Sequence, residues 1–474
     1  MSITLATDVC VIGAGAAGLS VASGAAQLGR KTVLIERGRM GGDCLNTGCV
    51  PSKALLAAAK AAASVAAASR FGVEAKVSGI DFARVHAHVR RAIAAIEPND
   101  SAERFRGLGV EVVQAQARFT GPDTLITDQG HTIRARRFVI ATGSRAAVPP
   151  IDGLERVPYL NNETLFEAVL APQHLIVLGG GPIGVEMAQA WRRLGVAVTL
   201  LEKFHLLPKD DPELVALVRR QLIADGVALR EGADIIGVEP VAGGVGVRLG
   251  TGEAIAGSHL LVATGRKPVT EGLDLAAAGV AFTEKGVTID PHLRTTNRRI
   301  YAVGDVTGLP NFTHLAGQEA SLVIRNMLFR LFPGSVSLKA LPWVTYAEPE
   351  LAQVGLTEAQ AKAAHPDVQI VRVPFHDNDR AQAEAATEGM LKVMVLKGGK
   401  QVLGASIAGA HAGELIAPFV QLIARGRPLG DLLAGMAPYP TLGEAARRAA
   451  GAVYGPKLFN DRVRRLVAAL AWFG

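Results

Sequence analysis

The sequence predicts an α/β protein in which one strand–turn–helix–strand unit occurs twice and is followed by a separate α+β part. Three observations carry this prediction. An apolar run, a glycine-rich turn, a helical stretch and a second apolar run ending in glutamate start near residue 8 and again near residue 174. An apolar run ending in Ala-Thr-Gly follows each copy, and alternating runs replace this pattern beyond residue 341. The 474 residues, 49% of them hydrophobic, suffice for about three domains with sizeable cores.

The two glycine turns stand at the same distance from the acid that follows them. GAGAAG occupies residues 13–18 and GGGPIG occupies residues 179–184, and Glu36 and Glu202 each lie 23 residues after the first glycine. Such glycines let the backbone approach a pyrophosphate, whose charge rests on the next helix N-terminus, while the acid accepts a hydrogen bond from a ribose hydroxyl. The alternative, two plain βα turns, does not explain the shared context. We therefore predict two Rossmann-like dinucleotide-binding domains.

The Ala-Thr-Gly elements indicate how the copies are nested. The first lies 105 residues after Glu36 and the second 61 residues after Glu202, so that the first copy carries about 44 extra residues. The run IYAVGDVTG at 300–308 is expected to be a last strand that returns to the first sheet. We expect a discontinuous first domain at 1–150 and 280–340, a second domain at 151–279 inserted into it, and a C-terminal α+β domain at 341–474.

Charge and hydropathy exclude two classes of partner. The 50 Lys+Arg against 43 Asp+Glu give a net charge of +7, but the basic residues are spread in pairs and aromatic residues make up only 5%. We therefore expect no nucleic-acid partner. The uncharged run Val9–Leu28 has the length of a membrane span, yet its glycines predict a strand, a turn and a helix. We expect no transmembrane segment and, without a signal peptide, a cytoplasmic location.

The C-terminal end is also apolar. The residues from Leu466 onward are too few to span a bilayer. Packing at an interface and anchoring at a membrane surface both remain open for this tail.

The three cysteines rule out a disulfide-stapled scaffold but leave room for redox chemistry. Cys10 lies in an apolar run and is expected in the core, whereas Cys44 and Cys49 lie in GGDCLNTGCVPSK. A regular helix would hold Cα atoms five residues apart at about 8–9 Å, so the two can pair only across an irregular backbone, which Gly48 permits. A helix N-terminus stabilises a thiolate and suits the pair for redox turnover. Two unrelated thiols are the alternative, and a metal site would need further ligands that the sequence does not offer, so we expect no resident metal.

These motifs together resemble one enzyme family. The cysteine run, both glycine turns, both Ala-Thr-Gly elements, AVGD, YAEPELAQVGLTE (346–358) and HAGELI (411–416) are similar to the pyridine nucleotide-disulfide oxidoreductases. That family includes dihydrolipoamide dehydrogenase, glutathione reductase and mercuric reductase, and the resemblance runs from about residue 6 to about residue 460. It implies a homodimeric flavoprotein enzyme in which NAD(P)H reduces FAD and FAD reduces a disulfide.

The resemblance assigns roles to individual residues. Cys49 corresponds to the flavin-proximal cysteine, which forms a charge-transfer thiolate, and Cys44 to the interchange thiol that meets the acceptor. Lys53 and Glu186 match the pair beside the reactive edge of the flavin. A carboxylate at Glu202 repels a ribose phosphate, which favours NADH over NADPH. The residues expected to bind FAD are Gly13, Gly15, Ala16, Gly18, Glu36, Arg37, Gly42, Lys53, Thr142, Gly143, Ser144, Asp305 and His314, and those expected to bind the nicotinamide nucleotide are Gly181, Pro182, Ile183, Gly184, Glu202 and Gly265.

The acceptor side departs from the thiol-directed members. Those members carry His-Pro-Thr-x-x-Glu near the C-terminus, whereas this chain reads YPTLGE, with Tyr439 at the histidine position and Glu444 retained. A phenol is a poor base at neutral pH, so exchange with lipoamide or glutathione should be slow. Tyrosine there resembles mercuric reductase, although this C-terminal tail lacks that enzyme's cysteine pair.

The acceptor is therefore left open among a metal ion, a small disulfide and an oxidant such as a quinone. The alternatives to a mercuric reductase-like enzyme are a dihydrolipoamide dehydrogenase with an altered base and a docked flavoprotein subunit of a multienzyme complex.

Overall fold

The computed structural model describes residues 3–329 and 331–473, and its contacts divide the chain into two compact units. Unit 1 comprises residues 1–179, 193–197 and 234–336, and unit 2 comprises residues 180–192, 198–233 and 337–474. The three domain boundaries expected from the sequence stay a prediction.

The main sheet of unit 1 confirms the predicted return of the chain. Its strands follow the order β3-β2-β1-β6-β5-β4, with β18 also pairing with β6. Strands β1, β2, β3, β6 and β18 pair in parallel, while β4, β5 and the start of β6 pair antiparallel. Ile300–Ala302 forms β18 and lies beside Phe138–Ile140 of β6. The bounds are β1 Thr4–Ile12, β2 Thr32–Glu36, β3 Val110–Gln114, β4 Ala117–Gly121, β5 Thr124–Thr127, β6 Thr132–Ile140 and β18 Ile300–Ala302.

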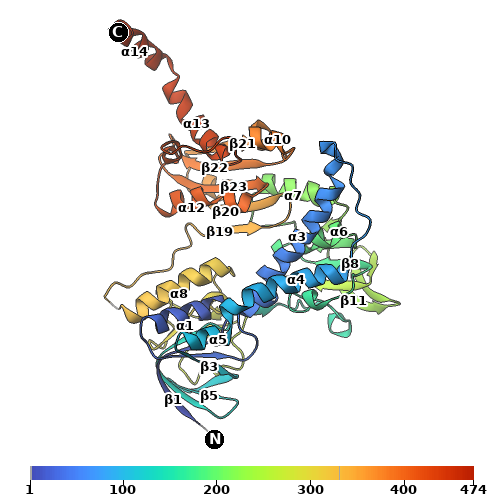
Figure 1. Ribbon diagram of the computed structural model, residues 1–474, viewed down its shortest axis with the longest axis vertical. Coiled ribbons are helices and arrows are strands. Elements are labelled where there is room, and N and C mark those ends of the chain that lie inside the picture. The colour runs from blue at the N-terminus through green and yellow to red at the C-terminus, as the bar shows by residue number, and fades with distance from the viewer. Residues whose placement is uncertain (1–2, 330, 474) are drawn as a thin grey trace. The chain divides into compact units, whose positions relative to one another are not determined.

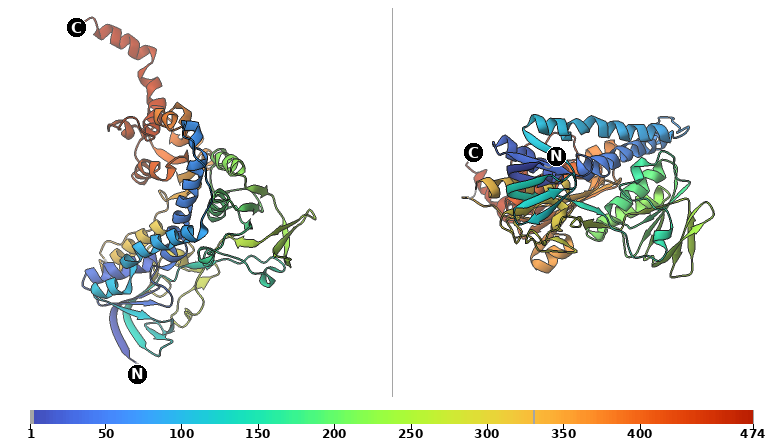
Figure 2. Two further views of the ribbon diagram at one scale, coloured as in Figure 1. Left: turned by 45° about the vertical axis from the view of Figure 1, so that its right-hand side comes forward. Right: turned by 90° about the horizontal axis from the view of Figure 1, so that it is seen from below.

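Two helices cover one face of this sheet. Helices α1 (Ala16–Gln27) and α8 (Thr313–Leu328) run side by side, and their apolar residues form one core with those of β1 (Figure 1). Helices α3 (Cys49–Ala66) and α4 (Phe82–Ile96) also pack against each other, as both views in Figure 2 show. The uncharged run Val9–Leu28 is thus part of β1, the glycine turn and α1, as predicted.

The other elements of unit 1 are short. Strand β8 pairs with β14 in parallel, β11, β12 and β13 form an antiparallel sheet, and β7–β15 and β16–β17 are two-stranded. The bounds are α2 Gly42–Asn46, α5 Ala102–Gly107, β7 Ser144–Ala146, β8 His174–Leu178, β11 Ile235–Val241, β12 Gly244–Leu249, β13 Ala254–Gly257, β14 His259–Val262, β15 Arg266–Pro268, β16 Phe282–Thr283 and β17 Gly286–Val287.

One helical stretch of unit 1, Gly42–Ala66, is long and apolar enough to cross a membrane by length and composition, with 22% of its apolar window buried. A single such stretch is weak evidence for a span. Here it consists of two helices, α2 and α3, with a break at Thr47–Gly48.

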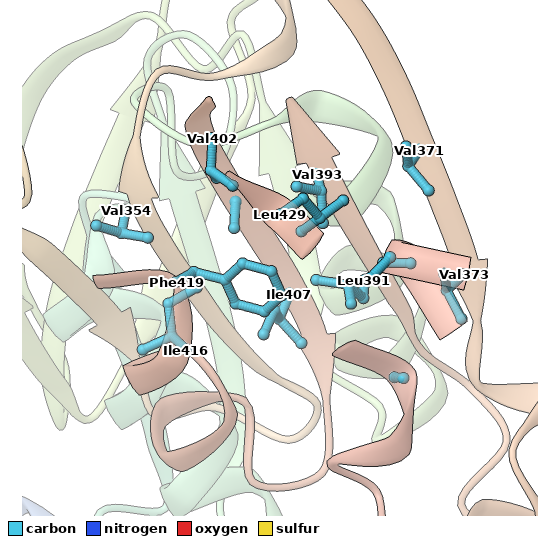
Figure 3. Packing of buried hydrophobic residues seen from close by; sticks show 14 of the residues in the cluster. Val354, Val371, Val373, Leu391, Val393, Val402, Ile407, Ile416, Phe419 and Leu429 are labelled. Carbon is cyan, nitrogen blue, oxygen red and sulfur yellow. The ribbon is translucent and has the colours of Figure 1, made fainter. Parts of the chain in front are cut away.

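Unit 2 contains an antiparallel sheet of the predicted kind. Its order is β19-β20-β23-β22-β21, and β21 pairs with β22 in a register that places Val371 opposite Val393. Phe419 of α12 and Ile416 pack against Ile407 of β23 in the core (Figure 3). Strands β9 and β10 pair in parallel. The bounds are α6 Pro182–Arg193, β9 Ala197–Glu202, α7 Pro212–Ala224, β10 Ala228–Glu231, β19 Pro342–Thr345, β20 Glu350–Gly355, α9 Glu358–Ala364, β21 Val368–Pro374, α10 Asp379–Ala383, β22 Met390–Leu396, β23 Val402–Gly409, α11 Ala412–Leu415, α12 Ala417–Ala424, α13 Glu444–Leu458 and α14 Asp461–Leu470.

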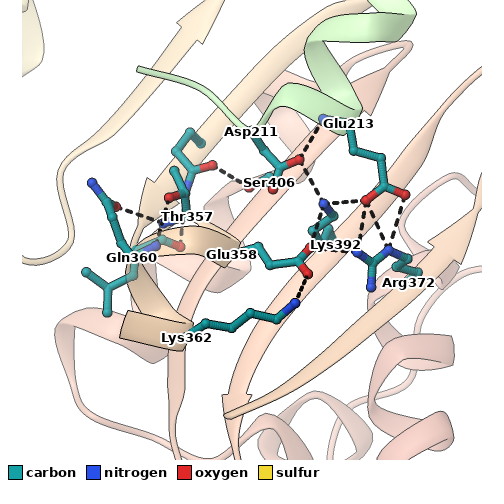
Figure 4. Close-up of polar contacts among 11 residues, drawn as sticks. Asp211, Glu213, Thr357, Glu358, Gln360, Lys362, Arg372, Lys392 and Ser406 are labelled. Atoms are coloured by element: carbon teal, nitrogen blue, oxygen red, sulfur yellow. Dashed lines mark hydrogen bonds and ion pairs between the residues drawn. The ribbon is translucent and has the colours of Figure 1, made fainter. Parts of the chain in front are cut away.

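A buried lysine lies in the middle of this sheet. The Lys392 side chain is only 1% exposed, and its Nζ lies 2.8 Å from Asp211 Oδ1, 2.5 Å from Glu213 Oε2 and 2.8 Å from Glu358 Oε2 (Figure 4). Asp211 is itself 2% exposed and caps the N-terminus of α7. The ammonium therefore ties α7 and α9 to β22, and its pair with Asp211 is shielded from water.

Replacing Lys392 by methionine leaves the Asp211 carboxylate buried without its cation. We expect this variant to lose about 3–5 kcal/mol of unfolding free energy, because an uncompensated buried charge is strongly destabilising. A lower urea midpoint, followed through the fluorescence of Trp343 in β19, measures the loss. Arg372, which contacts two of these acids, Glu213 and Glu358, and is 40% exposed, supplies the matched control Arg372→Met, with an expected loss below about 1 kcal/mol. Equal losses in the two variants would contradict this explanation.

Candidate active site

The first glycine turn is packed so closely that residues with a Cβ atom do not fit at several of its positions. Gly13 has φ +103°, and a Cβ there would collide with the carbonyl oxygen of Ala141, in the first Ala-Thr-Gly element. A Cβ on Gly18 would collide with the carbonyl of Gly13, and one on Gly42 would lie 2.6 Å from Gly15 Cα. Glycine is required here because helix, strand and cysteine segment converge on one turn.

The two glutamates repeat one geometry. Glu36 accepts hydrogen bonds from the backbone amides of Ala14 (2.6 Å, Oε2) and Gly38 (2.6 Å, Oε1) in unit 1. Glu202 accepts them from the amides of Gly180 (2.6 Å, Oε2) and Phe204 (2.8 Å, Oε1) in unit 2. In both copies the partners are the second residue of the glycine turn and the residue two after the acid. Each carboxylate is thereby held at the end of its strand, where an adenosine ribose would meet it.

The helix N-termini of unit 1 suit a pyrophosphate. Helix α1 follows Gly15 and helix α8 follows Phe312, and neither has a side-chain cap hydrogen bond or an acidic residue in its first turn. Uncapped amides and the positive end of the helix dipole favour a bound phosphate. A Cβ on Gly15 would meet nothing closer than Gly42 Cα at 3.9 Å, so the backbone is open to a close approach. The residues present therefore fit FAD.

The remaining residues predicted to bind FAD lie in unit 1. Ala16 begins α1, the exposed Arg37 follows Glu36, and His314 is in the first turn of α8, stacked on Phe312 with ring centroids 5.2 Å apart. Thr142 donates a hydrogen bond from Oγ1 to the Val269 carbonyl at 2.7 Å, and Gly143 has φ +68°.

The second glycine turn has an open side and a closed side. A Cβ on Gly180 would lie 3.0 Å from Glu202 Cβ and 2.7 Å from Leu206, whereas one on Gly181 would meet nothing within 4 Å. Pro182 begins α6, Gly184 is buried within it and Ile183 is 41% exposed. Gly265, which lies in unit 1, has φ +142°. An open glycine at a helix start, with a carboxylate fixed behind it, fits a nicotinamide dinucleotide.

The cysteines lie on either side of a helix break. Cys44 is in α2 and Cys49 is the first residue of α3, with Thr47 and Gly48 between the helices. Gly48 has φ −127° and ψ −109°, and a Cβ there would lie 2.9 Å from the Asp43 carbonyl oxygen. The break supplies the irregular backbone that pairing of the two sulfurs needs.

The two thiols have different environments. Hydrogen bonding to Cys49 and burial raise the pKa of the Cys44 thiol, whose side chain is half-buried. Cys49 is exposed, its Sγ lies 3.5 Å from Thr313 Oγ1, and its position at the start of α3 favours a thiolate. The pKa of the Cys44 thiol is thus raised by the neighbour with which it is predicted to pair.

A polar network joins the cysteine segment to distant motifs of unit 1. Asp43, next to Cys44, accepts hydrogen bonds from Arg266 and Thr47, and from Asn162 Nδ2 at 3.0 Å. The Arg266 Nε donates to Ser144 Oγ at 2.7 Å, and Ser144 Oγ donates to Asp305 Oδ2 at 2.5 Å. Burial raises the pKa of Asp305 despite these partners.

Asp43 and Arg266 were missed by the sequence analysis. Their only signal was their position, directly beside the cysteine and Ala-Thr-Gly motifs. Glu319 of α8 was also missed. Its Oε2 accepts the Gly304 amide at 2.6 Å, its buried Oε1 has no partner among the described residues, and burial raises its pKa to about 7.

A cavity of about 390 Å³ adjoins Cys44 in unit 1. Its walls include Ser20 and Ser23 of α1, Arg104 of α5 with Asp100 just before that helix, and Thr313 of α8. This volume is at the lower end of small-ligand sites. Ala16 and Thr313, which begin α1 and α8, also line it, so the cavity adjoins the helix N-termini expected to hold the FAD pyrophosphate.

The other predicted catalytic residues lie in different elements. Lys53 is four residues after Cys49 on α3 and shares its helix face, while Glu186 of α6 is buried in unit 2 and accepts the Tyr346 amide at 2.9 Å. Tyr439, also in unit 2, is 70% exposed and donates from Oη to Asp379 Oδ2 at 3.1 Å, which raises its pKa. Glu444 begins α13, and its buried Oε2 has no hydrogen-bond partner within residues 3–329 and 331–473. In the same ranges no three His, Cys, Asp or Glu side chains gather to hold a metal ion.

Comparisons with known proteins agree with this arrangement. The mercuric reductase of Streptomyces lividans is 36% identical over 453 residues, covering 94% of this chain and 95% of the relative. The dihydrolipoyl dehydrogenase of Thermus scotoductus is 36% identical over 463 residues, covering 94% and 97%. Among solved structures, the Cu(II) complex of the HOCl-induced flavoprotein disulfide reductase RclA from Escherichia coli superposes with a TM-score of 0.86 at 28% identity, covering 96% of this chain and 100% of that one.

Family models cover most of the sequence. Residues 7–320 match the pyridine nucleotide-disulphide oxidoreductases, and residues 341–450 match the dimerisation domain of that family. The chain therefore belongs to the pyridine nucleotide-disulphide oxidoreductases, FAD-dependent enzymes that use NAD(P)H, and carries their dimerisation domain.

Proposed function

We propose that this enzyme passes electrons from NADH through FAD to a Cys44–Cys49 disulfide and on to a metal ion or a small disulfide, at an acceptor site of the mercuric reductase type. The observation that carries the proposal is the placement of the two thiols. They meet across the break between α2 and α3. A cytoplasmic location of the homodimer, where thiols stay reduced, is part of the proposal.

The protonation of the pair accounts for its reductive half-reaction. Bound FAD supplies two-electron transfer between NADH and the disulfide. The S–S bond breaks, Cys44 takes one proton and Cys49 remains a thiolate, so that the proton released from NADH balances the reaction. The raised pKa of Cys44 and the helix N-terminus at Cys49 support this division of roles.

The choice of acceptor depends on whether the site can supply protons to the product. A disulfide acceptor leaves as thiolates that need protonation, whereas a divalent metal ion takes two electrons and needs none. Tyr439 donates to Asp379, which raises its pKa, so it is a poor proton shuttle near pH 7. This favours a soft metal ion held by the two sulfurs.

The second candidate is a dihydrolipoamide dehydrogenase with an altered base. One observation favours it, because the Glu444 carboxylate that would orient a histidine is retained and has a buried oxygen without a partner among the described residues.

The NADH preference rests on Glu202. Two backbone amides fix its carboxylate in the position that a ribose phosphate of NADPH would approach. A fixed negative charge there repels the phosphate.

The cysteine roles are tested by the absorbance of the enzyme under anaerobic NADH. We expect wild type to show a long-wavelength thiolate-to-flavin band and Cys49→Ser to lose it, since a hydroxyl cannot supply the thiolate. Cys44→Ser is the matched control and should keep the band. A band of wild-type strength in Cys49→Ser would show that the roles are wrongly assigned.

The acceptor proposal is tested by Tyr439→His. An imidazole above Glu444 should raise the rate of lipoamide reduction at least about tenfold, because general acid–base catalysis contributes hundredfold or more. The increase in the lipoamide reduction rate should be smaller in the double variant Tyr439→His/Glu444→Gln, which lacks the carboxylate that would orient the imidazole. Steady-state assays of lipoamide and Hg²⁺ reduction measure both effects. An unchanged lipoamide rate would mean that the missing base does not limit that reaction.

The coenzyme preference is tested by Glu202→Ala. We expect the NADPH-to-NADH ratio of kcat/KM to rise about tenfold or more, since a like charge beside the phosphate is removed. Glu202→Gln keeps a hydrogen-bond acceptor and should retain more of the NADH activity. If wild type already uses NADPH as well as NADH, the preference proposed here fails.

A further inference from the structure

The C-terminal helix stands apart from the apolar core of its unit. In Figures 1 and 2, α14 follows α13, which packs on the five-stranded sheet, and extends away from that sheet. Asn460 caps α14, accepting from the Arg462 and Val463 amides at 3.0 and 3.1 Å, so the helix has a defined start. None of its residues is buried. The match to the dimerisation domain ends at residue 450, ahead of α14.

The helix has one apolar side and one basic side. Val463, Leu466, Val467 and Leu470 recur at the spacing of a single helix face, and the last three are 57%, 58% and 59% exposed. Arg462, Arg464 and Arg465 occupy the rest of its first turns. Trp472 and Phe473, directly after the helix, are 90% and 88% exposed.

The net positive charge of the C-terminal segment indicates what kind of surface would cover the apolar side of α14. The segment 459–474 holds three arginines against one aspartate, in a chain of net charge +7, so a second copy of α14 would bring like charges together. Arg464 pairs with Asp461 at 3.4 Å, but both side chains are more than two-thirds exposed and the pair is weak. The ten residues of α14 extend about 15 Å, half of what a bilayer core requires. A surface that is anionic outside and apolar inside would bind the arginines of the helix and bury its apolar side chains.

We propose that α14 is an interfacial anchor that lies in the plane of a bilayer containing anionic phospholipid. Its leucines and valines enter the acyl boundary, its arginines bind lipid phosphates through paired N–H groups, and the terminal aromatic residues lie at headgroup level. This proposal is independent of the acceptor and of the cysteine chemistry. It assigns the enzyme a peripheral place on a membrane without a spanning segment.

The test is sedimentation of the FAD-loaded full-length enzyme with vesicles. We expect binding to vesicles of phosphatidylcholine with 30% phosphatidylglycerol and little to phosphatidylcholine alone. Replacing Arg462, Arg464 and Arg465 by glutamine should weaken partitioning about 100-fold, since each such residue near an anionic surface contributes about fivefold. Leu470→Glu should weaken it at least about tenfold through loss of apolar insertion.

The matched control is Ala468→Glu, which adds the same charge on the opposite side of the helix. It should bind better than Leu470→Glu. All variants should keep the wild-type rate of NADH oxidation without vesicles, which confirms folding. Absence of vesicle binding would overturn the proposal, as would equal binding by Leu470→Glu and Ala468→Glu. A change of oligomeric state in Leu470→Glu, measured by light scattering, would instead assign the apolar side to a second copy of the chain.

Discussion

The ion pair between Arg266 and Asp43 holds four separate motifs of unit 1 in one place. Arg266 follows the second Ala-Thr-Gly element, and its guanidinium also binds Ser144, which follows the first, and lies 3.8 Å from Asp305 of AVGD. The pairing of β7 with β15 sets Arg266 opposite Ala146 and brings the two elements together. Asp43, which binds the Arg266 guanidinium, lies at the start of α2, one residue before Cys44. The position of the reactive thiol therefore depends on contacts made by residues more than 200 positions away.

The sequence predicted the parts of this site that local chemistry specifies. The glycine turns could be predicted because only glycine fits at Gly13 and Gly18, where a Cβ would collide with backbone atoms. The recurrence of the acid at one spacing was the second signal. The return of Ile300–Ala302 to β6 was legible from an apolar run that ends in an acid. The partnership of Asp43 with Arg266 was not, because no periodicity relates residues brought together by a two-stranded pairing of β7 and β15. The roles assigned to Cys44, Cys49, Lys53 and Glu186 stay predictions.

The alternation of apolar residues in the C-terminal strands predicted the sheet but not the buried lysine and its three acidic partners. The run from Leu391 to Val395 is one of the alternating runs beyond residue 341 and pairs with β21, and by alternation alone Lys392 would lie on a solvent-exposed face. It is buried because the start of α7 and helix α9 cover that face and present Asp211, Glu213 and Glu358. Hydrogen bonds from Lys362, Lys392 and Arg372 outweigh burial and lower the pKa of Glu358 to about 2. Its contribution to stability is thus complete above the ordinary pKa of glutamate and is lost as the pH falls from about 5 toward 2.

The proposed acceptor rests on the protons that the site can supply, because the fold does not choose between the candidates. Relatives of nearly equal identity are named for a metal ion and for lipoyl groups, so overall similarity does not choose between them. In the proposed reduced state, Cys44 carries one proton, which a disulfide acceptor could use once, leaving its second sulfur as a thiolate. A histidine would supply that second proton, whereas a tyrosine whose pKa is raised by Asp379 holds its proton firmly near pH 7. Reduction of a divalent metal ion returns a proton to solvent instead of consuming one. Under this proposal, tyrosine in place of histidine at residue 439 leaves out a group that only one of the two reactions requires.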